Sequence, residues 1–373
     1  MIGLPGISNV SITQRQQGHM NFASDNVYGV HPAIMQAMAD ANSGTQSSYG
    51  SDEFTKRAEQ QLCEIFEREV DVYLVLTGTA ANSLCVSAMV PPYGACLCHA
   101  EAHIMVDECG APELFSGGAK LIGIPDPAGK LTPASITKVL DGFIRGEHDP
   151  KPKAVSITQA TELGTVYALD EISAIADLAH GRGLRLHMDG ARFTNALVSL
   201  GCKPAEMTWK AGVDALSFGA TKNGAMMLEA VIFFDRSLSE DFIHRRMRSA
   251  QLLSKGRYLG AQMNAYLDNG LWLDNARHAN SIAAYLAAEL EKTRKVRLPL
   301  PVQANEVFPI MPRGLHDYLQ AAGAVFYEWP GEGPGTEELI EGNMFVRFVC
   351  SYMTTKEQCD ALVSEVNKWN GAA

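Results

Sequence analysis

Residues 154–190 read AVSITQATELGTVYALDEISAIADLAHGRGLRLHMDG, and this stretch decides the fold class. It contains two apolar runs, at 154–158 and 184–188, and each has the length of a buried strand. Between them, Asp170 is placed to cap a helix whose apolar residues recur at helical spacing before two glycines end it. A strand, a helix and a second strand in this order are typical of a parallel sheet in an α/β protein.

The same alternation continues on both sides of this stretch. It predicts further strands at 70–76, 215–218 and 230–234, and helices at 53–67 and from residue 80. After about residue 241 the pattern changes to a mostly helical segment at 242–290, short strands near 306–310 and 344–349, and a last helix opened by a capping box at 355–358. The sequence therefore predicts an N-terminal arm (1–20), a large domain with a mainly parallel sheet (21–268, including a helical connector from about 241), and a small α+β C-terminal domain (269–373).

Composition excludes several classes of function. The chain has 373 residues and a net charge of −11, so nucleic acids and anionic membranes would repel it. Hydrophobic residues make up 46% and charged residues 20%, which is typical of a packed globular protein. The first 17 residues contain no apolar run of the kind found in signal peptides, and no stretch is long enough to span a membrane. These features predict a cytoplasmic protein.

The eight cysteines do not form a disulfide framework by their spacing. The segment Cys96-Leu97-Cys98-His99 invites comparison with a metal site, but it lacks a second ligand pair at zinc-finger spacing. We therefore expect a strand of small buried residues here and no bound metal.

Three loops and one histidine carry candidate chemistry. The turn Thr77-Gly78-Thr79-Ala80-Ala81-Asn82 lies between a predicted strand and a predicted helix, where backbone N–H groups and the helix dipole favour an anion. It is neither a Walker A sequence nor a dinucleotide fingerprint, so a nucleotide is not expected. His103 precedes Glu108 by five residues, and a lone histidine acquires a role only if it faces the same pocket.

The other two loops follow predicted strands. In His187-Met188-Asp189-Gly190-Ala191-Arg192, the carboxylate of Asp189 could hold a proton on a heteroaromatic nitrogen, and Arg192 could bind a carboxylate. In Ser217-Phe218-Gly219-Ala220-Thr221-Lys222-Asn223-Gly224, Lys222 is flanked by small residues and could form a covalent bond to an aldehyde. An anion turn, an aspartate and a lysine after successive strands form the set that pyridoxal phosphate needs.

With these motifs, the chain resembles the threonine aldolase (β-eliminating lyase) family of pyridoxal phosphate enzymes. The resemblance runs from Phe22-Ala23-Ser24-Asp25-Asn26 to Val346-Arg347-Phe348-Val349. The stretches SFGATKNG (217–224) and SITQATELGTVY (156–167) are most similar to the phenylserine aldolase-like, low-specificity branch. The resemblance implies the aspartate-aminotransferase-like fold (fold type I), bound pyridoxal 5′-phosphate, and cleavage of L-β-hydroxy-α-amino acids such as threonine, allo-threonine and phenylserine to glycine and an aldehyde.

The family's residue roles carry over position by position. Lys222 matches the lysine that binds the cofactor, Asp189 the partner of the pyridine nitrogen, and His103 the imidazole stacked on the ring. Other matches are the phosphate turn (Gly78, Thr79), the group that binds the substrate carboxylate (Ser24, Arg192, Arg347), and two residues of a subunit interface (Tyr49, lent to the neighbouring site, and Arg257, reaching the phosphate). The resemblance also implies a homodimer or homotetramer with shared active sites.

One position departs from the family pattern. Many members have a second histidine in a T-H-N-G stretch, whereas this chain has Thr161-Glu162-Leu163-Gly164, with Glu162 in place of that histidine. In those relatives the histidine contacts the β-hydroxyl of the substrate. His103 is therefore our first choice for the base that takes the hydroxyl proton, because its unperturbed pKa of about 6.5 suits neutral pH, and Glu162 and Glu108 are the alternatives.

Two other functions stay open on the sequence. A different enzyme of this fold, an aminotransferase or a side-chain β-eliminating lyase, would share Lys222 and Asp189. A catalytically silent protein of the same fold, acting as a binding module, would not need the intact lysine, aspartate and arginines.

Overall fold

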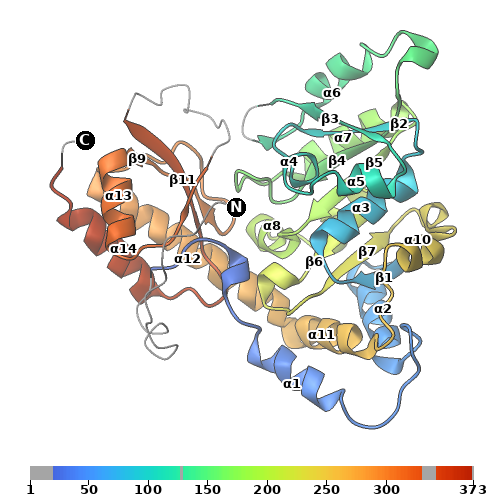
Figure 1. Cartoon of the computed structure of the whole chain (residues 1–373), viewed down its shortest axis with the longest axis horizontal. Helices are drawn as coiled ribbons and strands as arrows, with labels where there is room; N and C mark the ends of the chain where they lie inside the picture. The colour runs from blue at the N-terminus through green and yellow to red at the C-terminus, as the bar shows by residue number, and fades with distance from the viewer. Residues whose placement is uncertain (1–19, 127–128, 330–341, 372–373) are drawn as a thin grey trace, which may run out of the picture.

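The computed structural model describes residues 20–126, 129–329 and 342–371, and its larger part is built around one seven-stranded sheet (Figure 1). The strands are β1 (Asp71–Val75), β2 (Gly94–His99), β3 (Lys120–Ile124), β4 (Lys151–Thr158), β5 (Arg185–Gly190), β6 (Ala215–Gly219) and β7 (Glu229–Phe233). Their order in the sheet is β1-β7-β6-β5-β4-β2-β3. Only β7 runs antiparallel to its neighbours, so the prediction of a mainly parallel sheet is confirmed.

Both faces of this sheet are buried, as expected for strands with near-continuous apolar sequences. One face presents large side chains, including Leu97, Leu186 and Phe218, to the core that also contains residues of α2, α7, α8 and α11. The other face presents small side chains in its middle strands, Cys96 and Cys98 among them, and larger ones such as Phe233 to the core that contains the buried apolar residues of α3. The two cysteines therefore lie in a buried strand, as the sequence predicted, and the small side chains leave room for α3 to pack closely.

Helices precede, connect and follow the strands of this sheet (Figure 1). They are α1 (Pro32–Asp40), α2 (Glu53–Ile65), α3 (Gly78–Met89), α4 (His103–Val106), α5 (Ala111–Phe115), α6 (Pro133–Leu140), α7 (Leu169–Gly181), α8 (Phe193–Leu200), α9 (Pro204–Met207), α10 (Phe242–Arg248) and α11 (Arg257–Leu267).

The long helix α12 (Leu271–Thr293) leads to a second group of elements with its own core. This group contains β8 (Glu306–Val307), β9 (Ile310–Pro312), α13 (Arg313–Ala321), β10 (Tyr327–Glu328), β11 (Asn343–Val349) and α14 (Lys356–Lys368). Strand β11 pairs antiparallel with the other three strands. The predicted capping box at the start of α14 is present, because Thr355 Oγ1 accepts a hydrogen bond from Gln358 N. The domain boundaries at 21–268 and 269–373 stay a prediction.

Two sequence expectations need correction. Helix α7 begins at Leu169 and its N-cap is Ala168, so Asp170 is not the cap, and Glu171 Oε2 accepts a hydrogen bond from Ala168 N instead. The strand expected at 306–310 is split into β8 and β9. The mostly helical segment predicted at 242–290 is confirmed, and it consists of α10, α11 and most of α12.

The predicted arm at 1–20 lies outside the described residues except for Met20, which is buried. Across the described parts of the chain, no helix combines the length and the apolar character that crossing a bilayer requires.

Candidate active site

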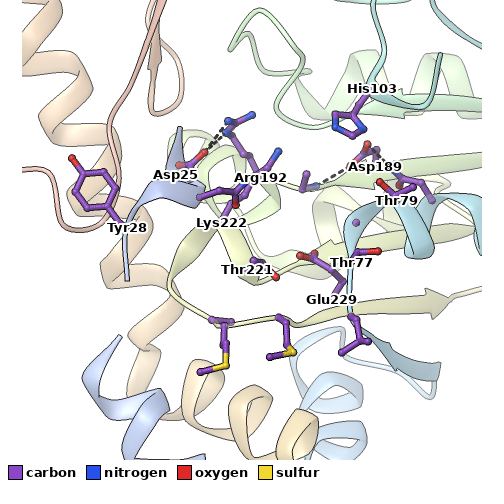
Figure 2. Close-up of a pocket in the computed structure, with 18 of the residues that line it drawn as sticks. Asp25, Tyr28, Thr77, Thr79, His103, Asp189, Arg192, Thr221, Lys222 and Glu229 are labelled. Carbon is purple, nitrogen blue, oxygen red and sulfur yellow. Dashed lines mark hydrogen bonds and ion pairs between the residues drawn. The ribbon is translucent and has the colours of Figure 1, made fainter. Parts of the chain in front are cut away.

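One edge of the large sheet carries most of the predicted residues. The carboxyl ends of β4, β5 and β6, the turn after β1 and the beginning of the antiparallel β7 all meet at this edge, which is where open α/β sheets bind ligands. They surround a cavity of about 520 Å³ (Figure 2). Its lining includes Gly78, Thr79, His103, Glu162, Asp189, Arg192 and Lys222, all predicted from the sequence.

The turn after β1 forms an anion site at the beginning of α3. Thr77 is the N-cap, and its Oγ1 accepts a hydrogen bond from Ala80 N at 3.1 Å. The N–H groups of Gly78 and Thr79 belong to the first turn, where backbone donors have no partner within the helix. A Cβ added at Gly78 would meet no atom within 4 Å, so the backbone is open to the cavity at this point. The turn can therefore hold a phosphate group.

Asp189, the next-to-last residue of β5, is held rigidly at the cavity. Its Oδ1 accepts a hydrogen bond from Ala191 N at 2.9 Å, and its Oδ2 accepts one from Asn82 Nδ2 at 2.8 Å. The residue is only 3% exposed. Since each carboxylate oxygen has more than one acceptor position, Asp189 can still accept a hydrogen bond from a protonated ring nitrogen.

Lys222 lies in a short 3-10 helix, Thr221–Asn223, that follows β6. Gly219 explains how this loop comes so close to the end of β5, because a Cβ there would be 2.6 Å from the carbonyl oxygen of Ala191. Lys222 lines the cavity, and within the described chain its Nζ has no hydrogen bond or ion pair. The amine is therefore available to a ligand.

His103 begins α4 and faces the cavity with a side chain that is 34% exposed. Its Nδ1 lies 2.8 Å from Oε1 of the buried Glu108, and this hydrogen bond raises the pKa of His103. Its backbone N–H donates to Glu162 Oε1 at 3.2 Å. Burial raises the pKa values of both Glu108 and Glu162. All three candidates for the base are thus neighbours, but Glu108 is not among the residues that line the cavity.

Arg192 is buried among carboxylates. Its Nη2 lies 2.8 Å from Asp25 Oδ2 and 3.2 Å from Glu306 Oε1. Burial disfavours the charged guanidinium, but Glu306 and Asp25 outweigh this effect and raise the pKa of Arg192. Arg347 Nη1 lies 3.6 Å from the same Glu306 oxygen, and its guanidinium lies over the Trp329 ring. The two predicted arginines are therefore linked through one buried glutamate.

Besides Glu108, four predicted residues do not line this cavity. Ser24 immediately precedes the lining residue Asp25, and its Oγ accepts a hydrogen bond from Asn26 N. Arg347 lines a second cavity with Trp329. Tyr49 is 54% exposed, and Arg257 donates to the backbone carbonyls of residues 41, 43 and 44. The roles proposed for Tyr49 and Arg257 require a second subunit, so they stay predictions.

Three site residues were missed by the sequence analysis. Glu229 lines the cavity at the beginning of β7, where burial raises its pKa to about 7. Asn82 bonds to Asp189, and Glu306 pairs with both arginines. A charged residue at the border of an apolar strand was the available signal for Glu229 and Glu306, whereas nothing in the sequence distinguished Asn82 from other helix residues.

Comparison with known proteins agrees with this geometry. The profile of the family described as beta-eliminating lyase matches residues 21–312. The chain belongs to the beta-eliminating lyase family. A low specificity L-threonine aldolase of Pseudomonas aeruginosa is 44% identical over 352 residues, which cover 94% of this chain and 98% of that protein. A low specificity L-threonine aldolase of Saccharomyces cerevisiae is 27% identical over 281 residues, covering 74% and 70% of the two chains.

Solved structures place this beta-eliminating lyase on the predicted fold. A threonine aldolase of Leishmania major superposes with a TM-score of 0.86 at 30% identity and covers 93% of this chain and 98% of its own. A putative L-allo-threonine aldolase of Listeria monocytogenes gives a TM-score of 0.70 at 16% identity, with 95% and 98% covered, which supports the fold alone. The predictions of family, fold type I and a lyase activity that depends on pyridoxal phosphate are confirmed.

The donor set around the cavity fits pyridoxal phosphate. The anion turn, the free amine of Lys222 and the fixed carboxylate of Asp189 match its phosphate, aldehyde and ring nitrogen. A buried oxygen, Asn82 Oδ1, has no hydrogen-bond partner within the described chain. Such an unpaired acceptor is costly unless a ligand or water pairs with it. The residues present can therefore hold the cofactor.

Proposed function

We propose that this enzyme cleaves the Cα–Cβ bond of L-β-hydroxy-α-amino acids, with L-threonine as one substrate, to give glycine and an aldehyde. The observation that carries the proposal is the arrangement of Lys222, Asp189 and the beginning of α3 around one cavity, with the imidazole of His103 beside them. The names of the relatives support the same reaction, since those of Pseudomonas aeruginosa and Saccharomyces cerevisiae are both described as L-threonine aldolases.

Pyridoxal phosphate, when bound, supplies a conjugated ring that withdraws electrons from the bond that breaks. The amine of Lys222 holds the cofactor covalently at Nζ. The carboxylate of Asp189 keeps a proton on the ring nitrogen, and its two hydrogen bonds fix it for this task. The N–H groups of Gly78 and Thr79 bind the phosphate at the positive end of α3.

The substrate carboxylate is bound by the arginine side of the cavity. Arg192 already pairs with Asp25 and Glu306. A guanidinium has five N–H donors, and those that are not used by these two residues can bind an incoming carboxylate. Arg347 lines the second cavity and is linked to Arg192 through Glu306, and its buried Nε has no hydrogen-bond partner in the described structure. Binding the carboxylate here fixes rotation about the Cα–N bond, which decides whether Cα–Cβ is the bond that breaks. Ser24 stays a proposed contact of the same carboxylate.

His103 takes the proton of the β-hydroxyl at Nε2. Its Nδ1 is occupied by Glu108, so Nε2 is the ring nitrogen that remains for the substrate. Loss of the hydroxyl proton allows the aldehyde to leave with Cβ, and a proton returned to Cα completes glycine. Glu162 lines the cavity as the alternative base, and it would need the raised pKa that burial gives it.

The test is a substrate panel assayed for both kinds of product. We expect L-threonine, L-allo-threonine and phenylserine isomers to yield glycine and the matching aldehyde. Ammonia and a keto acid in place of glycine would instead identify a β-eliminating lyase, and transfer of the amino group to a keto acid would identify an aminotransferase. No turnover of any substrate by protein that carries the cofactor would support the silent binding protein. The panel also decides between threonine and phenylserine as the preferred substrate, a choice that the sequence leaves open.

We also propose that the enzyme is a homodimer or homotetramer located in the cytoplasm. The exposed ring of Tyr49 and the loop bonded to Arg257 support an interface on this side of the molecule. Sedimentation analysis of wild-type protein and of a Tyr49→Glu variant tests the proposed oligomer and its interface. The variant should dissociate more readily than wild type, and a monomeric wild type would contradict the proposed oligomer.

A further inference from the structure

A continuous chain of hydrogen bonds joins Asp189 to His103 through two residues that the reaction scheme does not use. Asn82 Nδ2 donates to Asp189 Oδ2 at 2.8 Å and to Glu108 Oε1 at 2.9 Å. The same Glu108 oxygen lies 2.8 Å from His103 Nδ1. The four residues come from α3, β5 and the segment around α4, so only the tertiary fold brings them together. His103 and Asp189 lie near each other in the pocket (Figure 2).

Glu108 is placed to orient His103 rather than to contact substrate. Its side chain is 0% exposed, whereas that of His103 is 34% exposed and faces the cavity. An ionised carboxylate can only accept hydrogen bonds, so His103 Nδ1 must carry the hydrogen. In the neutral ring, Nε2 is then the acceptor nitrogen, as a base requires. The same arrangement of carboxylate and imidazole fixes the tautomer in serine proteases.

Asn82 allows two carboxylates to lie on either side of it. One amide nitrogen has two hydrogens, and here one goes to Asp189 and the other to Glu108. The charged and titratable groups that act on His103 are Glu108, Asp189, Glu162 and Lys222. Of these, Glu108 is the one hydrogen-bonded to the ring, so it has the largest influence on the imidazole.

We propose that Glu108 and Asn82 are positioning residues of the aldol cleavage, in which Glu108 fixes the Nδ1–H tautomer of His103 and Asn82 fixes Glu108 relative to Asp189. This inference rests on the proposed function for its kinetic consequence, because His103 is the base only in that reaction. Its structural part, the tautomer, is independent of any substrate.

The first experiment uses wild-type enzyme with its cofactor and no substrate. Nitrogen NMR of histidine-labelled protein, with the His103 signals assigned by their loss in His103→Gln, reports which ring nitrogen carries the hydrogen. We expect Nδ1–H in the neutral ring, and an Nε2–H tautomer would overturn the proposal whether or not the enzyme cleaves threonine.

The second experiment compares Glu108→Gln with wild type. Loss of the carboxylate removes the interaction that raises the pKa of His103, so the imidazole should titrate at lower pH by NMR. The acid limb of the pH profile of kcat/KM should also move to lower pH, by about one unit. We expect kcat to fall by about 100-fold and the affinity for the cofactor to change by less than about threefold. Glu113→Gln, in the nearby α5 and outside this hydrogen-bond chain, is the matched control and should behave as wild type.

Unchanged kcat, pH profile and His103 titration in Glu108→Gln would overturn the proposal while leaving the aldolase activity intact. If Glu108→Gln does not fold, Asn82→Ser serves instead. The shorter serine side chain cannot donate to both Asp189 and Glu108 as the amide of Asn82 does. This variant should lower kcat and shift the titration of His103 in the same direction as Glu108→Gln. A wild type that cleaves no β-hydroxy amino acid would refute the proposed function alone.

Discussion

Replacing Arg192 by methionine is the perturbation for which the structure gives the clearest magnitude. The Arg192 side chain is 6% exposed, and its Nη2 lies 2.8 Å from Asp25 and 3.2 Å from Glu306. Methionine keeps most of the length of the side chain but removes the guanidinium. Glu306 is itself 0% exposed, and neither of its carboxylate oxygens has a hydrogen-bond donor in the described structure. The variant therefore leaves buried carboxylates without their main counter-ion.

Removing one partner of a buried ion pair costs about 3–5 kcal/mol in the free energy of unfolding, because the remaining charge stays desolvated. An exposed pair is worth about 0–1 kcal/mol. Arg277→Met is the matched control, since Arg277 pairs with Asp274 at 2.7 Å but the two side chains are 59% and 70% exposed. The structure thus predicts a large loss at Arg192 and almost none at Arg277.

Urea unfolding followed by circular dichroism measures both variants. A further Glu306→Gln substitution in the Arg192→Met protein should recover part of the loss, because it removes one of the unpaired charges. A loss below about 1 kcal/mol at Arg192, or no recovery in the double variant, would refute the view that the guanidinium neutralises this buried cluster.

Further variants test separate parts of the site. His103→Phe should keep the cofactor but slow Cα–Cβ cleavage by about 100-fold or more, and an unchanged rate would assign the base to Glu162. Thr77→Ala removes the helix cap and should lower the free energy of unfolding by about 1 kcal/mol, as measured by denaturant titration. It should also weaken the binding of inorganic phosphate to cofactor-free protein, as measured by phosphate titration. Because burial raises the pKa of Glu229 to about 7, the wild type loses stability as pH rises from about 4.5 to 7. Glu229→Gln should be free of this loss. Its free energy of unfolding relative to wild type should therefore increase by up to about 3 kcal/mol between pH 4 and pH 8. The same difference between variant and wild type at both pH values would contradict the assignment.

The sequence predicted the sheet because its strands are short apolar runs followed by glycine or polar loops. The chemistry at the ends of these strands was visible for the same reason, since Asp189 and Lys222 directly follow apolar segments. Parallel strands end at one edge of a sheet, so residues after different strands could be assigned to one site.

What the sequence did not reveal depends on strand direction and tertiary contacts. Glu229 is the first residue of β7, and it reaches the cavity only because β7 runs antiparallel to its neighbours. Asn82 and Glu306 acquire their roles from partners 107 and 114 residues away along the chain, Asp189 and Arg192. The N-cap of α7 was misplaced by two residues because Asp170 is a better capping residue than the Ala168 that occupies the position.

The identity of the lysine that carries the cofactor tests the account most directly. Enzyme reconstituted with pyridoxal phosphate is reduced with borohydride, digested and mapped by mass spectrometry. The structure predicts a reduced pyridoxyl group on the peptide that contains Lys222, the amine at the end of β6 that lines the cavity. Modification of a different lysine, or of none, would contradict it.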